Sequence, residues 1–309
     1  MEKIAAIDIG SNAIRFTSAD LVSQNEILLD EKIRIPLRLG TEAFSEAGMF
    51  SIDYIEYAQA TFLEIKKVLK NLNVQRCRTV ATSALRDAHN AHELIHAIES
   101  VSKIKVNTIS GEQEAKLILK AIQNSNELKS SKDYLLFDLG GGSLEISIIK
   151  HGKIKGSKSF NLGTVRVLEY SKCHQTKKDL DEWLSPKIKK IKLYIEDLIY
   201  DSDSIDVIGT GGNFRRLLKL KSSSDNSKSI SYPEVLEILK TLDNTSYLDR
   251  ILEYDLRPDR ADVIVPALKV ITKVLKGLPV NNIYAPRIGL TQGVLMDMSD
   301  GETHYDQIL

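Results

Sequence analysis

A short peptide pattern occurs twice in this chain, once at its start and once near its middle. Each copy runs an apolar strand into an aspartate and then into a turn of small residues, as IDIGSN at positions 7–12 and FDLGGGS at positions 137–143. The strand brings a carboxylate to its end, and glycine and serine let backbone N–H groups approach an anion. The repeat therefore predicts two anion-binding turns that face one another as a clamp.

The length of the chain agrees with an internal duplication. A chain of 309 residues exceeds what one compact core usually covers, so two domains are expected. Strand and helix signals alternate within each half, which favours an α/β layer fold. The polar stretch at 124–131 is the predicted boundary and gives domains 1–126 and 127–309, with the last helix free to pack back on the first domain.

Composition argues against several classes of protein. Hydrophobic residues make up 42% of the chain and charged residues 27%, and no apolar run approaches the roughly 18–20 residues of a membrane span. Met1 leads straight into a strand without room for a signal peptide, so a cytoplasmic location without membrane contact is expected. The 42 basic and 42 acidic residues cancel, which argues against a nucleic-acid polymer as partner. Cys77 and Cys173 lack metal-ligand spacing and are expected to be reduced core thiols.

Periodicity and turn residues predict the order of the elements. Each half opens with three strands, after which helices and strands alternate. The predicted strands are 3–9, 13–21, 26–35, 79–82, 105–109, 134–138, 144–149, 153–160, 206–208 and 282–285. The predicted helices are 51–72, 91–100, 111–124, 164–170, 177–200, 232–242, 261–275 and one from 289. A third turn of small residues, at 209–212, precedes a helix with Arg215 and Arg216 and is a further anion-loop candidate.

Six segments occur in an order that matches a known family. They are residues 7–12, 81–88 (ATSALRDA), 109–115 (ISGEQEA), 138–145, 162–166 (LGTVR) and 209–212 (GTGG). Together they resemble the motif set of the exopolyphosphatase and guanosine pentaphosphate phosphatase family, and the match runs over residues 4–295. The resemblance implies two ribonuclease-H-like domains of the actin and sugar-kinase superfamily, an active site in the interdomain cleft, and a short form with the catalytic core only.

Glu114 is the candidate catalytic base. Hydrolysis of a phosphoanhydride needs a positioned water, a group that accepts its proton, and cations that offset charge on the phosphate oxygens. Glu114 lies near the start of a helix and, by the pattern Ser-Gly-x-x-Glu-Ala, matches the family's catalytic glutamate. The alternative is that Glu112 and Glu114 only complement the helix dipole, with Ser110 as the cap. The family usually has an acid directly before this glutamate, and Gln113 stands there instead.

Asp138 and Glu145 are the candidate metal ligands. They lie on either side of the glycine turn, and a tight hairpin would return Glu145 close to Asp138, giving two hard oxygen ligands of the kind that Mg²⁺ prefers. They match the metal-associated pair of the family. The alternative is an aspartate that caps the turn and a glutamate on a solvent face. Asp8 holds the equivalent place in the first repeat and would reach the metal through water, but Arg15 replaces the second acid there.

Cations and glycine turns supply the candidate phosphate contacts. Arg86 and Arg166 resemble phosphate-binding positions of the family, and a guanidinium donates two parallel hydrogen bonds to phosphate oxygens. Lys190 is a further candidate, although the lysines of its helix are equally typical of a solvated face. Arg260 is equally compatible with a salt bridge at a helix start. The turn residues assigned to phosphate are Gly10, Ser11, Asn12, Gly140, Gly141, Gly142, Ser143, Gly209, Thr210, Gly211 and Gly212.

Two further segments bear on the resemblance. GLTQG at 289–293 departs from the family's usual Gly-Leu-Arg-Glu-Gly and removes a charge pair from the region that joins the domains. HELIH at 92–96 has the spacing of zinc peptidases, but so short a motif recurs by chance. Surface histidines on a polar helix are the simpler interpretation.

The sequence predicts an Mg²⁺-dependent exopolyphosphatase that removes the terminal phosphate of inorganic polyphosphate through a water activated by Glu114. The alternative with the same chemistry is a guanosine pentaphosphate 5′-phosphatase. Alternatives of another class are an ATP-using kinase and a non-catalytic protein that binds polyphosphate or a nucleotide. The expected partner is inorganic polyphosphate or guanosine pentaphosphate, and a homodimer is one option for the assembly.

Overall fold

The chain forms two compact units. The computed structural model describes residues 1–309 except 126–131, 175, 222–227, 302–306 and 309. The first unit joins residues 1–125 with 289–309, and the second comprises residues 126–288. The predicted boundary between residues 126 and 127 falls outside the described part of the chain. The last helix groups with the first unit, whereas the predicted limits 127–309 counted it with the second and allowed it to pack on the first.

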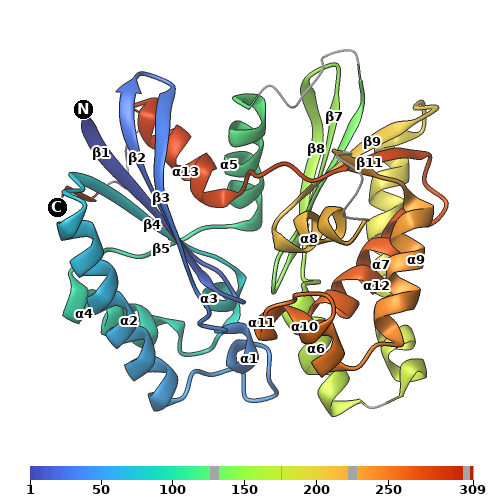
Figure 1. The fold of residues 1–309 in the computed structure, drawn as a ribbon, viewed down its shortest axis with the longest axis horizontal. Helices are drawn as coiled ribbons and strands as arrows, with labels where there is room; N and C mark the ends of the chain where they lie inside the picture. The colour runs from blue at the N-terminus through green and yellow to red at the C-terminus, as the bar shows by residue number, and fades with distance from the viewer. Residues whose placement is uncertain (126–131, 175, 222–227, 302–306, 309) are drawn as a thin grey trace. The chain divides into compact units, whose positions relative to one another are not determined.

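The first unit is built on a six-stranded sheet (Figure 1). Its strands are β1 Glu2–Ile9, β2 Ile14–Ser23, β3 Glu26–Ile35, β4 Arg76–Ala81, β5 Asn107–Thr108 and β12 Gln307–Ile308. The strands β3, β2 and β1 form an antiparallel meander, β4 pairs parallel with β1, and β5 pairs parallel with β4. The central β1 is buried on both faces, which explains its continuous apolar run.

Helices cover both faces of this sheet (Figure 1). They are α1 Gly40–Ala43, α2 Ile52–Asn71, α3 Ser83–Asp87, α4 Ala91–Ser102, α5 Gly111–Gln123 and α13 Leu290–Ser299. The helices α2 and α4 pack together against one face, where Phe62 and Leu94 are completely buried. On the other face α13 packs against α5, β1 and β2. A Cβ added at Gly293 would lie 2.0 Å from the carbonyl oxygen of Leu117, so the backbones of α13 and α5 are in direct contact.

A charged cluster fixes α13 within the first unit. Asp297 accepts hydrogen bonds from Arg78 at 2.5 Å and from Lys120 at 2.7 Å, and Lys120 also pairs with Asp300. Burial raises the pKa of Asp297, but the hydrogen bonds from Lys120 and Arg78 outweigh it, so the pKa of Asp297 lies below its usual value. The cluster matters for the site because Lys120 lies on α5, the helix that carries Glu114 in its first turn.

The second unit repeats the same strand order. Its strands are β6 Tyr134–Leu139, β7 Leu144–Lys150, β8 Lys153–Phe160, β9 Ile205–Thr210, β10 Ser229–Ile230 and β11 Val280–Tyr284. The order β8-β7-β6-β9-β11 corresponds to β3-β2-β1-β4-β5, with antiparallel and parallel pairs at the same places. Three antiparallel strands followed by two parallel ones form the ribonuclease-H-like sheet. The predicted α/β class with two ribonuclease-H-like domains is therefore confirmed.

The second unit also contains helices of very different lengths (Figure 1). They are α6 Thr164–Cys173, α7 Lys177–Ile199, α8 Gly212–Leu220, α9 Tyr232–Asp243, α10 Tyr247–Leu252, α11 Pro258–Ala261 and α12 Ile264–Leu275. The long α7 packs against α12, β7 and β8. Leu184, Ile191 and Ile195 recur at helical spacing on α7 and are completely buried in the core.

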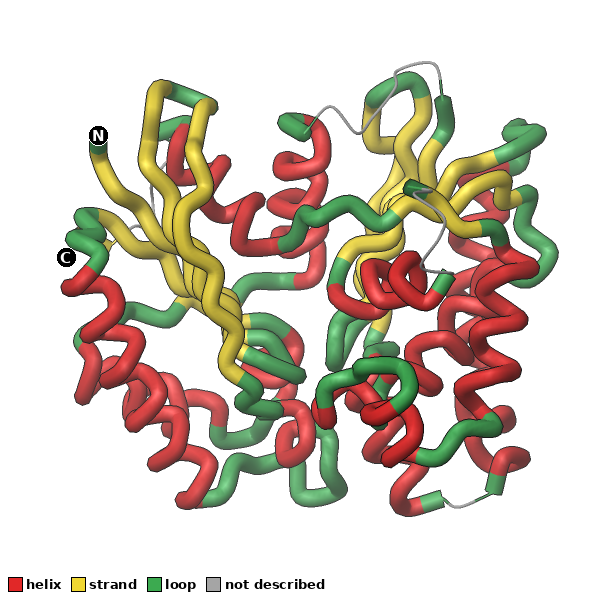
Figure 2. Tube along the Cα trace, viewed as in Figure 1, coloured by secondary structure: helices red, strands yellow, loops and turns green. Residues whose placement is uncertain are grey.

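Figure 2 shows the observed helices and strands, and most of the longer ones were predicted; the predicted strand 105–109 is shortened to Asn107–Thr108, and β10 and β12 were not predicted. The predicted helix 261–275 is observed as α12 but begins only at Ile264, because Ala261 is the last residue of the short α11. The short helices α1, α3 and α10 were not predicted, since four to six residues are too few for a helical period to be recognised.

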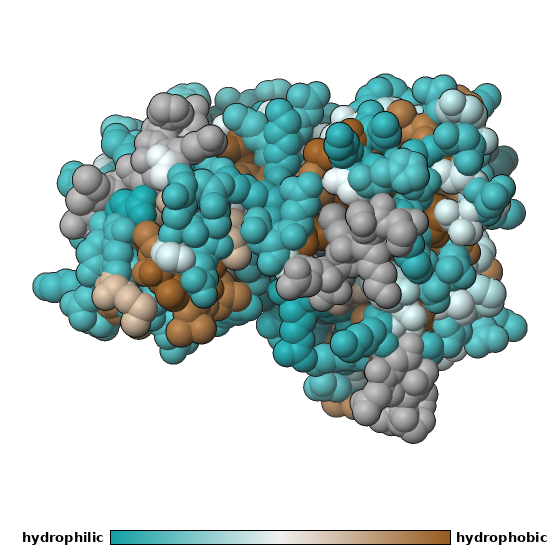
Figure 3. Space-filling view, turned by 90° about the horizontal axis from the view of Figure 1, so that it is seen from above, coloured by the Kyte–Doolittle hydropathy of each residue, from teal (hydrophilic) through white to brown (hydrophobic). Residues whose placement is uncertain are grey.

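The surface seen in Figure 3 is mostly hydrophilic, with apolar side chains in limited patches. Among the residues that the structure describes, no helix is long and apolar enough to cross a bilayer. Cys77 is buried and Cys173 is exposed, and both are free thiols. The expectation of core thiols is therefore confirmed for Cys77 and wrong for Cys173.

Candidate active site

The two glycine turns have the same backbone geometry. Gly10 N–H donates to the carbonyl oxygen of Ala13 at 3.2 Å, and Gly140 N–H donates to that of Ser143 at 3.0 Å. A Cβ would lie only 3.0 Å from this oxygen at Gly10 and 3.3 Å at Gly140. Neither glycine has a positive φ. Close backbone approach, rather than a left-handed conformation, therefore explains these two glycines.

Three sequence motifs meet within the first unit. The hydroxyls of Ser11 and Ser83 lie 2.8 Å apart, and Thr82 N–H donates to the carbonyl oxygen of Ile9. Ser83 lies 72 residues after Ser11 along the chain, and the parallel pairing of β1 and β4 brings the ends of these strands to the same edge of the sheet. The first glycine turn and the segment 81–88 are thus joined by hydrogen bonds at one edge of the sheet.

Arg86 joins the third motif to this group. Its Nη1 donates to the carbonyl oxygen of Ile109 at 2.8 Å and to Glu114 Oε2 at 3.2 Å. Glu114 is buried, with 8% of its surface exposed, whereas Glu112 is exposed. Glu114 therefore differs from Glu112 in its burial and in its contact with the partly buried Arg86.

Gln113 has a local role in the same turn. Ser110 accepts from Gln113 N–H at 3.2 Å, and the Gln113 side chain accepts from Ser110 N–H at 2.8 Å. This reciprocal pair is a capping box that fixes the start of α5. The glutamine that stands in place of the family's usual acid thus supports the helix on which Glu114 is placed.

Arg38 is a cation at the first turn that the sequence analysis missed. Its Nε donates to Asn12 Oδ1 at 2.7 Å, and Gly40 N–H donates to the carbonyl oxygen of Ser11 at 2.8 Å. The segment 37–40 therefore lies directly against the turn. An arginine between the buried Leu37 and Leu39 is the signal that would have identified it.

Equivalent positions on the two sheets differ in charge: the first unit carries two arginines and one aspartate, and the second carries two acids. In the first unit Arg34, Arg15 and Asp8 are paired in register across β3, β2 and β1. Arg15 and Asp8 form an ion pair at 2.7 Å, and the Asp8 side chain is only 3% exposed. Burial raises the pKa of Asp8 and outweighs the opposing effect of Arg15. The first repeat therefore balances its single acid with arginine.

In the second unit the same line across the sheet is acidic. Ser159, Glu145, Asp138 and Thr210 are paired in register across β8, β7, β6 and β9, and we call them the polar row. Paired residues on neighbouring strands share a face of the sheet, so these side chains are neighbours. Ser159 donates to Glu145 Oε1 at 2.8 Å, and carboxylate oxygens of Asp138 and Glu145 lie within 4.8 Å of one another. The predicted hairpin thus brings the two acids together.

The chemistry of the polar row fits a hard cation. Two carboxylates on adjacent strands repel one another unless a positive charge lies between them, and oxygen is the ligand that Mg²⁺ prefers. The Thr210 hydroxyl beside Asp138 is buried and has no hydrogen-bond partner in the described part of the chain. Asp138 and Glu145 could therefore bind a metal ion, and the Thr210 hydroxyl oxygen lies beside them.

The segment 162–166 is bonded directly to the second glycine turn. Thr164 N–H donates to Gly140 O at 3.0 Å, Val165 N–H donates to Gly141 O at 2.7 Å, and Arg166 Nε donates to Gly142 O at 2.5 Å. A Cβ at Gly163 would lie 2.3 Å from both Gly141 O and Gly142 N. Gly163 was not among the predicted site residues, because a contact between distant loops leaves no local signal.

Each of the three glycines in the third turn, at 209–212, has a structural reason of its own. A Cβ at Gly209 would lie 2.1 Å from the Phe214 ring, so packing accounts for this residue. Gly211 has φ +90°, which favours glycine. A Cβ at Gly212 would lie 2.4 Å from Arg260 Nη2. Arg260 therefore lies over this turn rather than acting only at a helix start.

The remaining predicted residues lie elsewhere. Lys190 is exposed on α7, and no hydrogen bond or ion pair recorded among the described residues joins it to a glycine turn. His92 and His96 are exposed on α4, and the one group of three potential metal ligands found among the described residues contains neither. In the unusual segment 289–293, Thr17 donates to Thr291 at 2.9 Å, so a hydroxyl pair binds α13 to β2 there.

Two ribonuclease-H-like units on one chain define the actin and sugar-kinase class of fold. The chain belongs to the Ppx/GppA phosphatase family, whose model matches residues 22–302. The family resemblance found in the sequence is therefore confirmed.

Named relatives share this chain's core. The chain is 25% identical over 291 residues to the bifunctional 3-dehydroquinate synthase/phosphatase of Fusobacterium nucleatum, a match that covers 88% of this chain and 43% of that protein. It is 25% identical over 308 residues to the guanosine-5′-triphosphate,3′-diphosphate pyrophosphatase of Aeromonas salmonicida, covering 96% of this chain and 60% of that protein. This chain thus spans less than two thirds of either relative.

A solved structure shares the fold over nearly the whole chain. The exopolyphosphatase of Cytophaga hutchinsonii superposes with a TM-score of 0.85 at 24% identity, and the match covers 98% of this chain and 99% of that one. This likeness confirms the fold.

Proposed function

We propose that this protein is an exopolyphosphatase that releases the terminal phosphate of inorganic polyphosphate. The observation that carries the proposal is the pairing of Asp138 with Glu145 across adjacent strands, beside a glycine turn that is bonded to Arg166. One unit thus combines an acidic pair suited to a metal ion with a small-residue turn and an arginine suited to phosphate. The first unit supplies a buried glutamate suited to activate water.

Glu114 is proposed to accept the proton of the attacking water. Arg86 donates to Glu114 Oε2 and to the carbonyl oxygen of Ile109, which holds the carboxylate in a fixed orientation. A phosphate that pairs with the Arg86 guanidinium would therefore lie near Glu114. Such proximity is what general-base catalysis requires, since the base must lie within hydrogen-bond reach of the water.

Asp138 and Glu145 are proposed to hold Mg²⁺, with Asp8 contributing through a water. When bound, Mg²⁺ would neutralise charge on the phosphate oxygens and orient the reacting group. The two carboxylates would supply charged oxygen ligands, and Ser159 would keep Glu145 in place through its hydrogen bond. Asp8 is the weaker candidate, because Arg15 already bonds to one of its carboxylate oxygens.

The phosphate chain is proposed to contact the glycine turns, Arg86 and Arg166. Backbone N–H groups of turns 10–12, 140–143 and 209–212 would donate to its oxygens. Arg38 and Arg260 lie at the first and third turns and are added to the predicted cations. Lys190 remains a prediction for binding farther along the chain. Neither unit carries every group, so the proposed reaction needs groups from both.

The choice of substrate is supported by the relatives. The exopolyphosphatase matches this chain over nearly its whole length, whereas this chain spans 60% of the guanosine pyrophosphatase. Guanosine pentaphosphate therefore ranks second. A protein that only binds polyphosphate or a nucleotide would not need a buried glutamate oriented by an arginine, so Glu114 argues against that alternative.

One comparison tests the proposal. Initial phosphate release is measured with one enzyme preparation on tripolyphosphate, long-chain polyphosphate and guanosine pentaphosphate, with Mg²⁺ and without an acceptor. We expect polyphosphate to react fastest, and Glu114→Gln to lower the rate of its hydrolysis by about 10²–10⁴-fold. Faster release from guanosine pentaphosphate would favour the alternative substrate. Turnover only with an added hydroxyl acceptor would indicate a kinase.

The cytoplasmic location and the homodimer also stay predictions. Cell fractionation tests the first, and light scattering of the purified chain tests the second.

A further inference from the structure

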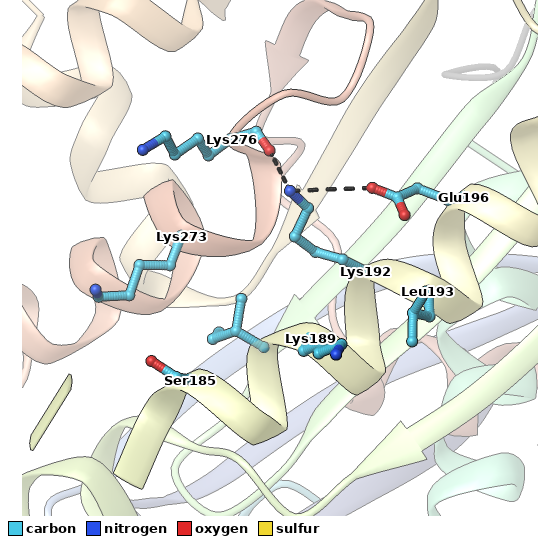
Figure 4. A pocket seen from close by; sticks show the side chains of 8 residues that line it. Ser185, Lys189, Lys192, Leu193, Glu196, Lys273 and Lys276 are labelled. Carbon is cyan, nitrogen blue, oxygen red and sulfur yellow. Dashed lines mark hydrogen bonds and ion pairs between the residues drawn. The ribbon is translucent and has the colours of Figure 1, made fainter. Parts of the chain in front are cut away.

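The second unit has a basic hollow that none of the assigned groups uses. It has a volume of about 450 Å³ and lies between α7 and the end of α12. Four lysines and one glutamate contribute its charged lining, and we call it the lysine groove: Lys189, Lys192, Lys273, Lys276 and Glu196. Figure 4 shows two of these lysines extending from α7 and two from the end of α12.

Positive charge exceeds negative charge in this groove. Lys192 donates to the carbonyl oxygen of Lys276 at 2.6 Å and lies 3.9 Å from Glu196 (Figure 4). Lys273 pairs with Asp181, outside the groove, at 3.0 Å. The four lysines carry four positive charges, and Glu196 and Asp181 carry two negative ones, so two positive charges remain.

The surplus belongs to two specific side chains. Lys189 and Lys276 are exposed, and neither ammonium group takes part in an ion pair recorded among the described residues. Lys192 has three N–H donors; among the described residues its recorded hydrogen bond goes to Lys276 O, and Glu196 lies beyond hydrogen-bond distance at 3.9 Å. A ligand with several acceptor oxygens could therefore bond to ammonium groups from both helices at once.

The chemistry of the groove favours a flexible polyanion. An ammonium is a point charge on a mobile stem, so it pairs with phosphate without the fixed fork of a guanidinium. The groove has no aromatic side chain in its lining on which a nucleotide base could stack. Its apolar part consists of Ile188 and Leu193, beside the lysine stems. Inorganic polyphosphate, with a negative charge on every phosphate, matches this lining better than a nucleotide does.

We propose that the lysine groove is an accessory binding site for inorganic polyphosphate. The inference rests on the proposed function for the identity of the ligand. A long chain bound in the groove would keep its remaining length at a high effective concentration around the same molecule. Long chains would gain affinity from the groove, and chains too short to extend beyond the active site would not.

Binding is tested in the 309-residue Glu114→Gln protein with EDTA, so that hydrolysis does not interfere. The test variant is Lys189→Ala/Lys276→Ala. Its matched control is Lys66→Ala/Lys67→Ala on α2, which removes the same charge from exposed helical positions of the other unit. Titration calorimetry with long-chain polyphosphate at two salt concentrations should show affinity about 3- to 10-fold weaker in the test variant only, as expected for two screened ion pairs. The salt dependence should also become less steep.

A second readout separates this proposal from the proposed function. With Glu114 restored and Mg²⁺ present, the groove variant should hydrolyse tripolyphosphate at the rate of the parent. Equal losses of long-chain affinity in both double variants, or none in the groove variant, would overturn the proposal. A larger loss for guanosine pentaphosphate than for polyphosphate would overturn the choice of ligand. If groove-dependent binding persists while no polyphosphate is hydrolysed, only the proposed function fails.

Discussion

Replacing Gly163 with alanine tests whether the second glycine turn must contact the start of α6. The new Cβ would lie 2.3 Å from Gly141 O and from Gly142 N, whereas ordinary contact begins at 3.4 Å. Both neighbours are backbone atoms, so no side-chain rotation relieves the overlap. The two segments must separate by about 1 Å, on the order of a third of a normal contact distance.

The separation has an energetic and a catalytic cost. It would stretch the hydrogen bonds that Thr164, Val165 and Arg166 donate into the turn. Overpacking costs about 1–3 kcal/mol and each of the three weakened bonds up to about 1 kcal/mol, so the free energy of unfolding of the second unit should fall by about 1–6 kcal/mol. Displacing catalytic groups by about 1 Å can cost about 10²-fold, and we expect kcat to fall by at least that factor.

Gly156→Ala is the matched control in the same unit. Its Cβ would meet Leu198 Cδ1 at 2.6 Å and the Tyr194 hydroxyl at 2.8 Å, which are ends of side chains that can move. Phosphate release and urea unfolding followed by circular dichroism are measured for both variants. A Gly163→Ala protein with parental rate and parental unfolding midpoint would refute the reasoning. Equal losses of rate and of unfolding midpoint in the two variants would show that the contact of Gly163 with the backbone of the turn has no particular importance.

Three further predictions concern the acids. Glu114→Gln should lower turnover by about 10²–10⁴-fold while calorimetry still detects polyphosphate binding, and near-normal turnover would reject the base assignment. Asp138→Asn and Glu145→Gln should each raise the Mg²⁺ concentration for half-maximal rate, and an unchanged requirement would limit them to shaping the turn. Because burial raises the pKa of Asp8, its stabilising contribution is present below the unfolded pKa and lost as pH rises through the folded pKa. Asp8→Asn should therefore raise the melting temperature more at pH 8 than at pH 4, and the opposite trend would contradict this.

The sequence determined the local structure and the repeated strand–turn–strand unit. Hydrophobic periods and turn residues are properties of neighbouring residues, so most of the longer helices and strands could be predicted, whereas the shortest elements could not. The contact between Asp138 and Glu145 was predictable for the same reason, because a tight hairpin fixes its own register. The sequence also predicted that the first repeat lacks a second acid, because Arg15 follows Asp8 at the same spacing at which Glu145 follows Asp138.

Tertiary structure decided which of these pieces meet. The bond between Ser11 and Ser83, the Arg86 contact with Glu114, and the closure of Gly163 on the second turn join segments far apart in the sequence. Such contacts depend on strand order and on the packing of whole elements, which no local pattern records. The return of α13 to the first unit is the largest example, because its apolar side chains and Asp297 find their partners on β1, β4 and α5. The sequence thus specified the chemistry of the site, and the fold specified which residues share it.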